Sequence, residues 1–420
     1  MKKTLTRTLV SALLCVGLLL PSLVGCTAAI KADNLMDGIT ANRVSGKSAD
    51  EDFIQSSADF AVKLFQKSAD GKNNIMISPL SVMLALAMTA NGADGQTKSQ
   101  AEALLGGGKS IDELNEYLYA YVKGLRSDRK SRLSIANSVW IKKDENFDVK
   151  KEFLQKNADW YNASMYRADF DNSTVSDINR WVDANTDGMI KKMIDSLGKD
   201  TVMLLINAIC FDAEWEEIYK DKDIKSGKFT DINGKKQDVS MMHSTESAYI
   251  TLDNGVGFTK PYANGNYSFA ALLPDENTDL ADFIASLSGE KLIHALKTKK
   301  HATVYTAMPK FSFDYEKEMN DILIDLGMSD AFDRNRADFS GIGKYTDSNI
   351  FINKVLHKTF ISVDAKGTRA GAATAVVLDK YGSAGGIKTY SVTLDRPFVF
   401  MIIDNKAELP IFIGALTQVK

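Results

Sequence analysis

The chain has 420 residues, of which 45% are hydrophobic and 25% are charged, and its formal net charge is −3. These values are typical of a soluble globular protein with a large core. There is no excess of basic residues that would point to a nucleic-acid partner. A chain of this length could hold two or three domains, but no change in composition marks a linker after residue 50, so we expect one domain over residues 51–420.

The N-terminus has the composition of a secretory signal peptide. Lys2 and Lys3 form a charged start, residues 9–20 are apolar, and Leu23-Val24-Gly25-Cys26 follows. This ending resembles a bacterial lipobox, which predicts a lipoprotein signal peptide over residues 1–25 and lipidation of Cys26. An ordinary signal peptide cleaved near Ala28 and Ala29 is the alternative.

Residues 26–50 are polar and contain Gly38 and Gly46. We therefore predict a flexible tether with a reach of about 25–30 Å. Cys15 lies in the signal peptide, Cys26 would carry the lipid, and Cys210 stands in the apolar run 204–211. No disulfide framework is possible, and we expect Cys210 to be buried and unreactive.

The remaining elements follow in chain order. Residues 53–65 have apolar side chains at helical spacing, and residues 74–88 predict a short strand and then a buried helix. Ser78 is the expected N-cap of that helix and Pro79 its first residue. Strands are predicted over 133–141 and over 205–215, which contains Asn207 and ends at Trp215; a helix is predicted over 178–190. A β-rich run over 351–364 contains His357.

Enzymatic motifs are absent from the sequence. The 4 histidines lack the spacing of a metal site, and no Gly-x-Ser-x-Gly motif occurs. Residues 183–188 fit the first half of a calcium-binding EF-hand loop, but its twelfth position is Ile194 instead of a glutamate. Residues 106–110 resemble the end of a phosphate-binding loop, yet Ala103 replaces its first glycine. We expect no catalytic residue, no metal and no cofactor.

Small, uncharged residues dominate the stretch that begins at Gly367. In an extended strand, one face would carry Thr368, Ala370, Ala372 and Thr374, and the other would carry Arg369, Gly371 and Ala373. Such a segment could enter between two strands without a steric or charge penalty. Composition alone also fits an Ala-rich helix or a plain linker.

The flanking motifs resemble those of the serpin family. Residues 355–374 carry "V.HK.FI.V…GT.A.AAT", residues 395–398 carry "DRPF", and the blocks around residues 74–97 and 207–215 are also similar. The resemblance covers residues 53–420. It implies an α+β serpin fold with roughly nine helices around three β-sheets and an exposed reactive loop near the C-terminus. It also implies a region where the central sheet opens, formed by Ser78, Ser81, Asn207, Trp215 and His357.

The same resemblance assigns the reactive loop to about residues 366–389 and its hinge to residues 367–374. The family's usual count from Gly367 puts the scissile bond between Tyr381 and Gly382. Lys380 and Leu378 are the alternates, because this loop is longer than usual. Tyr381 would suit chymotrypsin- or subtilisin-like serine proteases, and Lys380 would suit trypsin-like ones.

Two positions, one just before the hinge and one within it, depart from the family pattern. Ala365 and Arg369 stand where the family usually has glutamate, and Ala365 leaves Lys310 without the expected carboxylate. The resemblance nevertheless implies a monomeric, extracytoplasmic inhibitor, lipid-anchored at the cell surface or secreted. It would trap serine proteases as acyl-enzymes by inserting its cleaved loop into the central sheet. The alternative is a non-inhibitory serpin that acts as a surface binding or scaffold protein.

Overall fold

The structure is a computed structural model that describes residues 30–145, 147–198, 201–344, 349–368 and 388–419. Residues 31–420 form one compact unit. Within the described ranges, no helix is long and apolar enough to cross a membrane.

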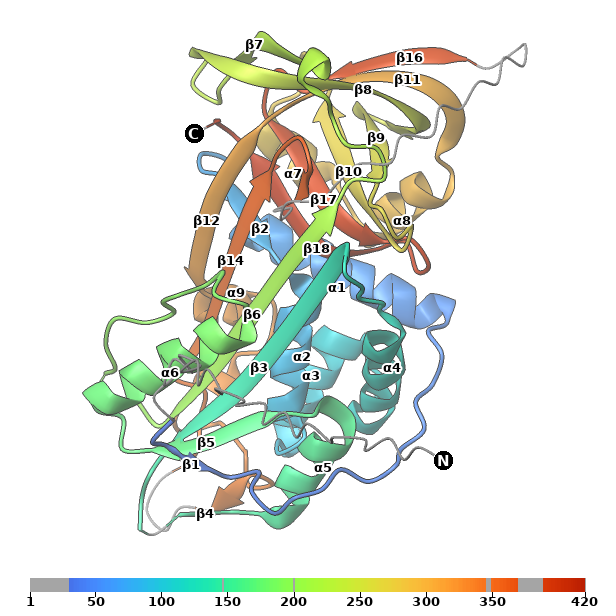
Figure 1. Ribbon diagram of the computed structural model, residues 1–420. Coiled ribbons are helices and arrows are strands. Elements are labelled where there is room, and N and C mark those ends of the chain that lie inside the picture. Colours follow the sequence, from blue (N-terminus) through green and yellow to red (C-terminus); the bar gives the residue numbers. More distant parts are fainter. Residues whose placement is uncertain (1–29, 146, 199–200, 345–348, 369–387, 420) are drawn as a thin grey trace, which may run out of the picture. The chain divides into compact units, whose positions relative to one another are not determined.

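A seven-stranded sheet runs through this unit (Figure 1). Its strands, in spatial order, are β1 (Asp33–Asn34), β5 (Ser164–Ala168), β3 (Ser131–Lys142), β6 (Met203–Glu214), β15 (Gly367–Thr368), β14 (Lys354–Val363) and β12 (Phe311–Glu318). β6 is antiparallel to β3 but parallel to β14, while the short β15 is antiparallel to both β6 and β14. The predicted strands 133–141 and 205–215 are the two long central strands of this sheet.

A nine-stranded sheet forms the other end of the unit (Figure 1). Its strands are β16 (Thr389–Thr393), β11 (Lys300–Pro309), β8 (Lys236–Leu252), β9 (Gly255–Pro261), β10 (Tyr267–Pro274), β17 (Phe398–Asp404), β18 (Leu409–Leu416) and β2 (Ile75–Ile77), with β7 (Ile224–Thr230) paired to β8. β4 (Asp148–Val149) and β13 (Gly343–Lys344) make a separate two-stranded pair.

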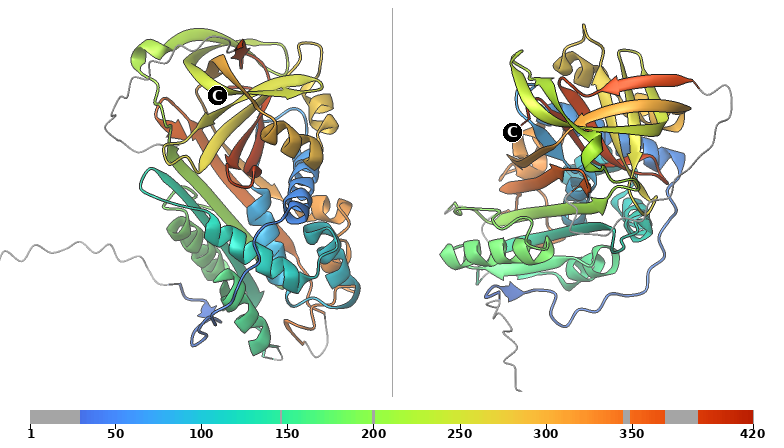
Figure 2. Two further views of the ribbon diagram at one scale, coloured as in Figure 1. Left: turned by 90° about the vertical axis from the view of Figure 1, so that its right-hand side faces the viewer. Right: turned by 45° about the horizontal axis from the view of Figure 1, so that its top comes forward.

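Two helices cover opposite faces of the seven-stranded sheet (Figure 2). On the inner face, α2 (Pro79–Ala90) is buried along its whole length, and the Ser78 side chain accepts a hydrogen bond from the backbone N–H of Ser81. The expected cap and first residue of this helix are therefore confirmed. α6 (Asn172–Asn185) crosses the outer face over β3.

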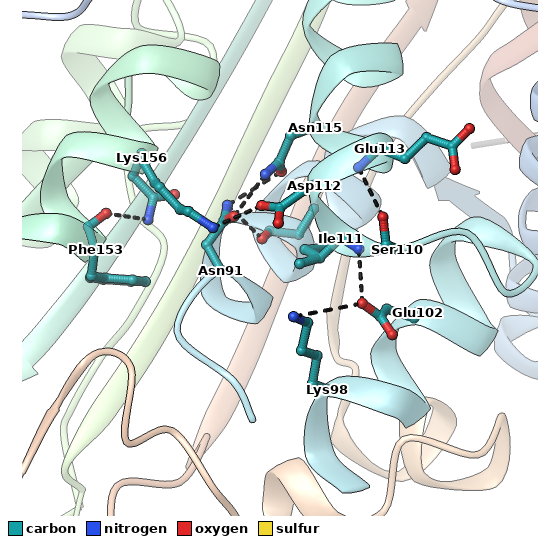
Figure 3. A network of polar contacts seen from close by, with 12 residues as sticks. Asn91, Lys98, Glu102, Ser110, Ile111, Asp112, Glu113, Asn115, Phe153 and Lys156 are labelled. Atoms are coloured by element: carbon teal, nitrogen blue, oxygen red, sulfur yellow. Dashed lines mark hydrogen bonds and ion pairs between the residues drawn. The ribbon is translucent and has the colours of Figure 1, made fainter. Parts of the chain in front are cut away.

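The other helices surround α2 and the nine-stranded sheet. They are α1 (Glu51–Ser68), α3 (Gly95–Gly106), α4 (Ile111–Gly124), α5 (Lys151–Tyr161), α7 (Leu280–Ser286), α8 (Gly289–Lys297) and α9 (Asn320–Asp325). Polar contacts join α4 to its neighbours (Figure 3): Lys156 of α5 donates to Asp112 at 2.7 Å, and Asn115 donates to Asn91 at 2.7 Å. These contacts fix the helical layer beneath α2.

Residues 31–50 differ from the flexible tether expected over residues 26–50. The backbone N–H groups of Lys31 and Ala32 both donate to Asp177 Oδ2 at 2.8 Å, and β1 pairs with β5. Further along, the backbone N–H of Asn42 donates to Asp159 at 2.7 Å. Backbone N–H groups make most of these contacts, and they are present whatever the side chains are. A polar composition therefore did not predict the attachment.

Cys210 lies on the outer face of β6 and is buried, as the sequence predicts. Its side chain is 1% exposed, and Sγ is 3.8 Å from the carbonyl oxygen of Thr186, just after α6. Leu204, Ile206 and Ala208 of the same face are also buried. The outer face of β6 is therefore covered from Leu204 to Cys210.

Candidate functional site

The candidate site is the seam between β14 and β6. The two strands form a parallel ladder from Lys354 opposite Leu204 to Lys358 opposite Ala208. Beyond Lys358, the described residues show no direct pairing of the two strands. At the far end, β15 takes the place between them, with Thr368 paired to both Val363 and Ala213. The seam is closed at one end and already separated by a third strand at the other.

A tight turn leads from β14 into β15, and the carbonyl groups of its three residues all accept hydrogen bonds. The indole Nε1 of Trp215 donates to the Asp364 carbonyl, the Tyr219 N–H to the Ala365 carbonyl, and the Trp215 N–H to the Lys366 carbonyl, each at 2.9 Å. The chain segment that follows β6 therefore fixes the start of the predicted hinge.

The two described hinge residues fit tightly into this end of the sheet. A Cβ atom on Gly367 would lie 1.9 Å from the carbonyl oxygen of Ala213, so only glycine allows this approach. Thr368 is 2% exposed, and its hydroxyl is 2.6 Å from the hydroxyl of Tyr262. Tyr262 in turn stacks on Trp215 with ring centroids 4.6 Å apart.

A buried polar cluster crosses the closed part of the seam. His357 Nε2 accepts the backbone N–H of Ser78 at 3.1 Å, so the ring proton is on Nδ1, which donates to Asn207 Oδ1 at 2.5 Å. The Asn207 amide donates to Ser81 Oγ and, at 2.7 Å, to Asn137 Oδ1. The cluster joins α2, β3, β6 and β14, and its members satisfy one another, as burial requires.

Burial lowers the pKa of His357 from 6.5 to about 3. The imidazole is therefore neutral at physiological pH, which its hydrogen bonds also require. A charged ring could not accept the Ser78 N–H and would be isolated from water.

The structure brings together four of the five residues predicted for the sheet-opening region: Ser78, Ser81, Asn207 and His357. Trp215 is apart from them, at the hinge end of the seam. The predicted positions that fall outside the described residues are Arg369, Ala370, Gly371, Ala372, Ala373, Thr374, Leu378, Lys380, Tyr381, Gly382 and Cys26.

Sequence reasoning did not single out Asn137, Tyr219 or Tyr262. The stretch 133–141, which contains Asn137, and the stretch Lys260-Pro261-Tyr262 also resemble serpin sequence blocks, so those stretches contained a usable signal. Tyr219 contributes a backbone N–H to the hinge turn, and its side-chain identity gives no hint of that contact.

No group of three or more His, Cys, Asp or Glu in the described ranges could hold a metal ion. In the EF-hand-like stretch, Asp187 instead pairs with Arg132 at 2.5 Å.

A profile of the family described as "Serpin (serine protease inhibitor)" matches residues 55–419. The chain belongs to the serpin family. Leukocyte elastase inhibitor A of Mus musculus is 30% identical to it, over 84% of this chain and 96% of that protein. The expected α+β serpin fold is thereby confirmed.

Solved serpin structures agree with the overall arrangement of this chain. The thermophilic serpin tengpin in its native state superimposes with a TM-score of 0.88 at 50% identity, covering 92% of this chain and 100% of that one. Tengpin in its latent state gives a TM-score of 0.79 at 46% identity, covering 89% and 100%. The present serpin is thus closer to the native form.

Proposed function

We propose that this serpin is an inhibitor of serine proteases that works by inserting its cleaved reactive loop between β14 and β6. One observation carries the proposal: β15 already lies antiparallel between these two strands. A strand that continued from Thr368 would enter the seam in the direction that β15 has set.

The register of β15 supports the same proposal. If the pairing of β15 continued past Thr368, Ala370 and Ala372 would lie between buried positions of β14 and β6. In the same register, Thr374 would lie beside His357 and Asn207. Small side chains suit the first two positions. A hydroxyl at Thr374 could join the polar cluster, so each inward-facing hinge residue matches what it would meet.

Insertion would exchange one parallel ladder for two antiparallel ones. Each added ladder hydrogen bond contributes roughly 1 kcal/mol net, and antiparallel pairing is slightly the more stable kind. The uncleaved form would then occupy a local free-energy minimum, separated by a kinetic barrier from the more stable inserted form. A protease acylated at the loop would be carried along the sheet, over roughly 45 Å for a strand of about 14 residues.

The proposal extends to target and location. Tyr381 and Gly382 at the scissile bond would favour chymotrypsin- or subtilisin-like proteases. The name of the murine relative, leukocyte elastase inhibitor A, supports a serine protease as the target. A lipid on Cys26 would hold the inhibitor on the extracytoplasmic side of a membrane.

The test is formation of a covalent complex. The protein is mixed with chymotrypsin, subtilisin, trypsin or elastase and then denatured in detergent. We expect a band at the summed mass, and sequencing of the released C-terminal fragment identifies the scissile bond. Thr368→Arg is the matched control, because a charged side chain cannot occupy a site that is 2% exposed. It should be cleaved without forming the complex.

Cleavage of the wild-type protein by every protease without a complex would contradict inhibition. It would favour the non-inhibitory, scaffold-like alternative, for which the alanine at position 365 and the long loop are the supporting features.

A further inference from the structure

A buried ion pair lies next to the hinge turn. Lys260 of β9 places Nζ 2.9 Å from Glu246 Oε1 of β8, and the two side chains are 2% and 7% exposed. The Glu246 carboxylate also accepts a hydrogen bond from Ser244 Oγ at 2.5 Å, and Ser244 is 2.9 Å from Thr306 Oγ1. The pair is well hydrogen-bonded and almost cut off from water.

Core stability alone does not explain this pair. Both ions lose their hydration on burial, and two apolar side chains of similar volume usually stabilise a fold as well or better. Burial by itself lowers the pKa of Lys260, but Tyr219 and Glu246 outweigh it and raise the pKa above its ordinary value. The ammonium group therefore stays charged inside the protein.

Two aromatic rings face that ammonium group. Lys260 Nζ lies 4.6 Å from the ring centroid of Tyr219 and 5.6 Å from that of Trp215. Both distances are within the range of cation–π attraction, which is strongest where water is excluded. The Tyr219 hydroxyl is also 3.2 Å from Ser244 Oγ, so the ring is linked to both ends of the ion pair.

Trp215 and Tyr219 are also the residues that hold the hinge turn. Between them they donate all three hydrogen bonds to the carbonyls of residues 364–366. Lys260 therefore contacts both residues that hold the turn, and its own ion pair is with Glu246 and not with a residue of the hinge.

We propose that Lys260, paired with Glu246, is a positioning residue that holds Trp215 and Tyr219 so that the start of the reactive loop stays inserted between β14 and β6. This rests on the proposed inhibitory function. Insertion would begin from a hairpin that already exists, so the entropy of forming the first turn is not part of the barrier. Without Lys260, the turn would have to form after cleavage, while the acyl-enzyme could hydrolyse.

The first variant is Lys260→Met with Glu246→Gln. It removes both charges together, keeps the volume, and retains an acceptor for Ser244, so no unpaired ion is left buried. The matched control is Lys299→Met with Glu408→Gln, a partly buried pair at 2.5 Å that does not contact the hinge turn. Tyr219→Leu is a second variant: it removes one aromatic face but keeps the backbone N–H and the ion pair.

Hydrogen exchange measures the positioning without any protease. In full-length protein, amides of residues 213–220 should exchange about tenfold faster in the Lys260 double variant and in Tyr219→Leu. The control pair and the β12 segment should keep wild-type rates. Unchanged exchange at 213–220, or equal acceleration over the whole sheet, would overturn the proposal.

The stoichiometry of inhibition measures the consequence. We expect several molecules of the Lys260 double variant to be cleaved for each protease trapped, while the association rate and the control pair remain at wild-type values. If the wild type forms no complex with any protease, the proposed function fails, but the exchange result still decides whether Lys260 positions the turn. Faster exchange at 213–220 with an unchanged stoichiometry would overturn the link to insertion.

Discussion

At the scale of single residues, His357 connects three elements through one neutral ring. It accepts from the N-terminus of α2 and donates to β6 while belonging to β14. Because its pKa is about 3 in the folded protein and 6.5 ordinarily, the unfolded chain binds more protons between these values. Folding stability must therefore rise with pH across this window and fall on acidification.

This predicts a histidine-dependent loss of stability in acid. At pH 5 the contribution of His357 should be lower than at pH 7.5 by about 2 kcal/mol, since each pH unit below the unfolded pKa is worth about 1.4 kcal/mol. Urea denaturation at several pH values checks this. His357→Gln should be less stable at pH 7.5 but should show a shallower decline; the same pH slope in both proteins would argue against the assignment.

Gly367 gives a second prediction at this scale. Gly367→Ala should push β15 away from β6, because the added Cβ would lie 1.9 Å from the Ala213 carbonyl oxygen. We expect a several-fold smaller fraction of covalent complex on a denaturing gel. Gly124→Ala is the control, since its added Cβ meets nothing within 4 Å. Equal complex formation by both variants would show that the close approach is unimportant.

At the scale of elements, the seam opens only if β14 moves relative to the segments that cover β6. Lys358 of β14 crosses the seam, because its Nζ donates to the carbonyl of Lys192 in the segment after α6 at 2.9 Å. It also pairs with Glu316 of β12. This side chain therefore links the two halves of the sheet that insertion must separate.

Lys358→Met should therefore ease the opening. Uptake of a synthetic peptide with the sequence of residues 367–378, followed on native gels, should become about tenfold faster or more, as expected for the loss of one hydrogen bond from a charged donor. Lys354→Met is the matched comparison: it removes the pair with Glu318, which stays on one side of the seam. A similar rate for both variants would rule out a special role for Lys358.

At the scale of the whole molecule, cleavage should stabilise the protein although it breaks the chain. The inserted strand would add hydrogen bonds on both sides, so the thermal midpoint of the cleaved form should rise by tens of degrees. Thermal denaturation followed by circular dichroism measures this. Cleaved Thr368→Arg should keep the thermal midpoint of its uncleaved form. An unchanged thermal midpoint in the cleaved wild-type protein would show that this serpin does not insert its loop.

Patterns in the sequence predicted much of this organisation but little of what holds the hinge. Pro79 and Ser78 marked the start of α2 because capping is a local property. The resemblance to serpins identified Asn207 and His357 as residues of the region where the sheet opens. No local pattern pairs Lys260 with Glu246, or Tyr262 with Thr368, since strand register over long separations brings them together. The attachment of residues 31–50 was missed because backbone N–H groups make most of its contacts, and composition does not reveal these.

The position of Cys210 has a practical consequence. It is the one cysteine in the described parts of the chain, and it is buried against the carbonyl that follows α6. A thiol reagent can reach it only when that cover lifts from β6. When reclosing is faster than labelling, the labelling rate divided by the rate for the unfolded chain gives the equilibrium constant of these openings, and from it their free energy. This serpin thus carries a chemical probe for motion of its outer face without any engineered label.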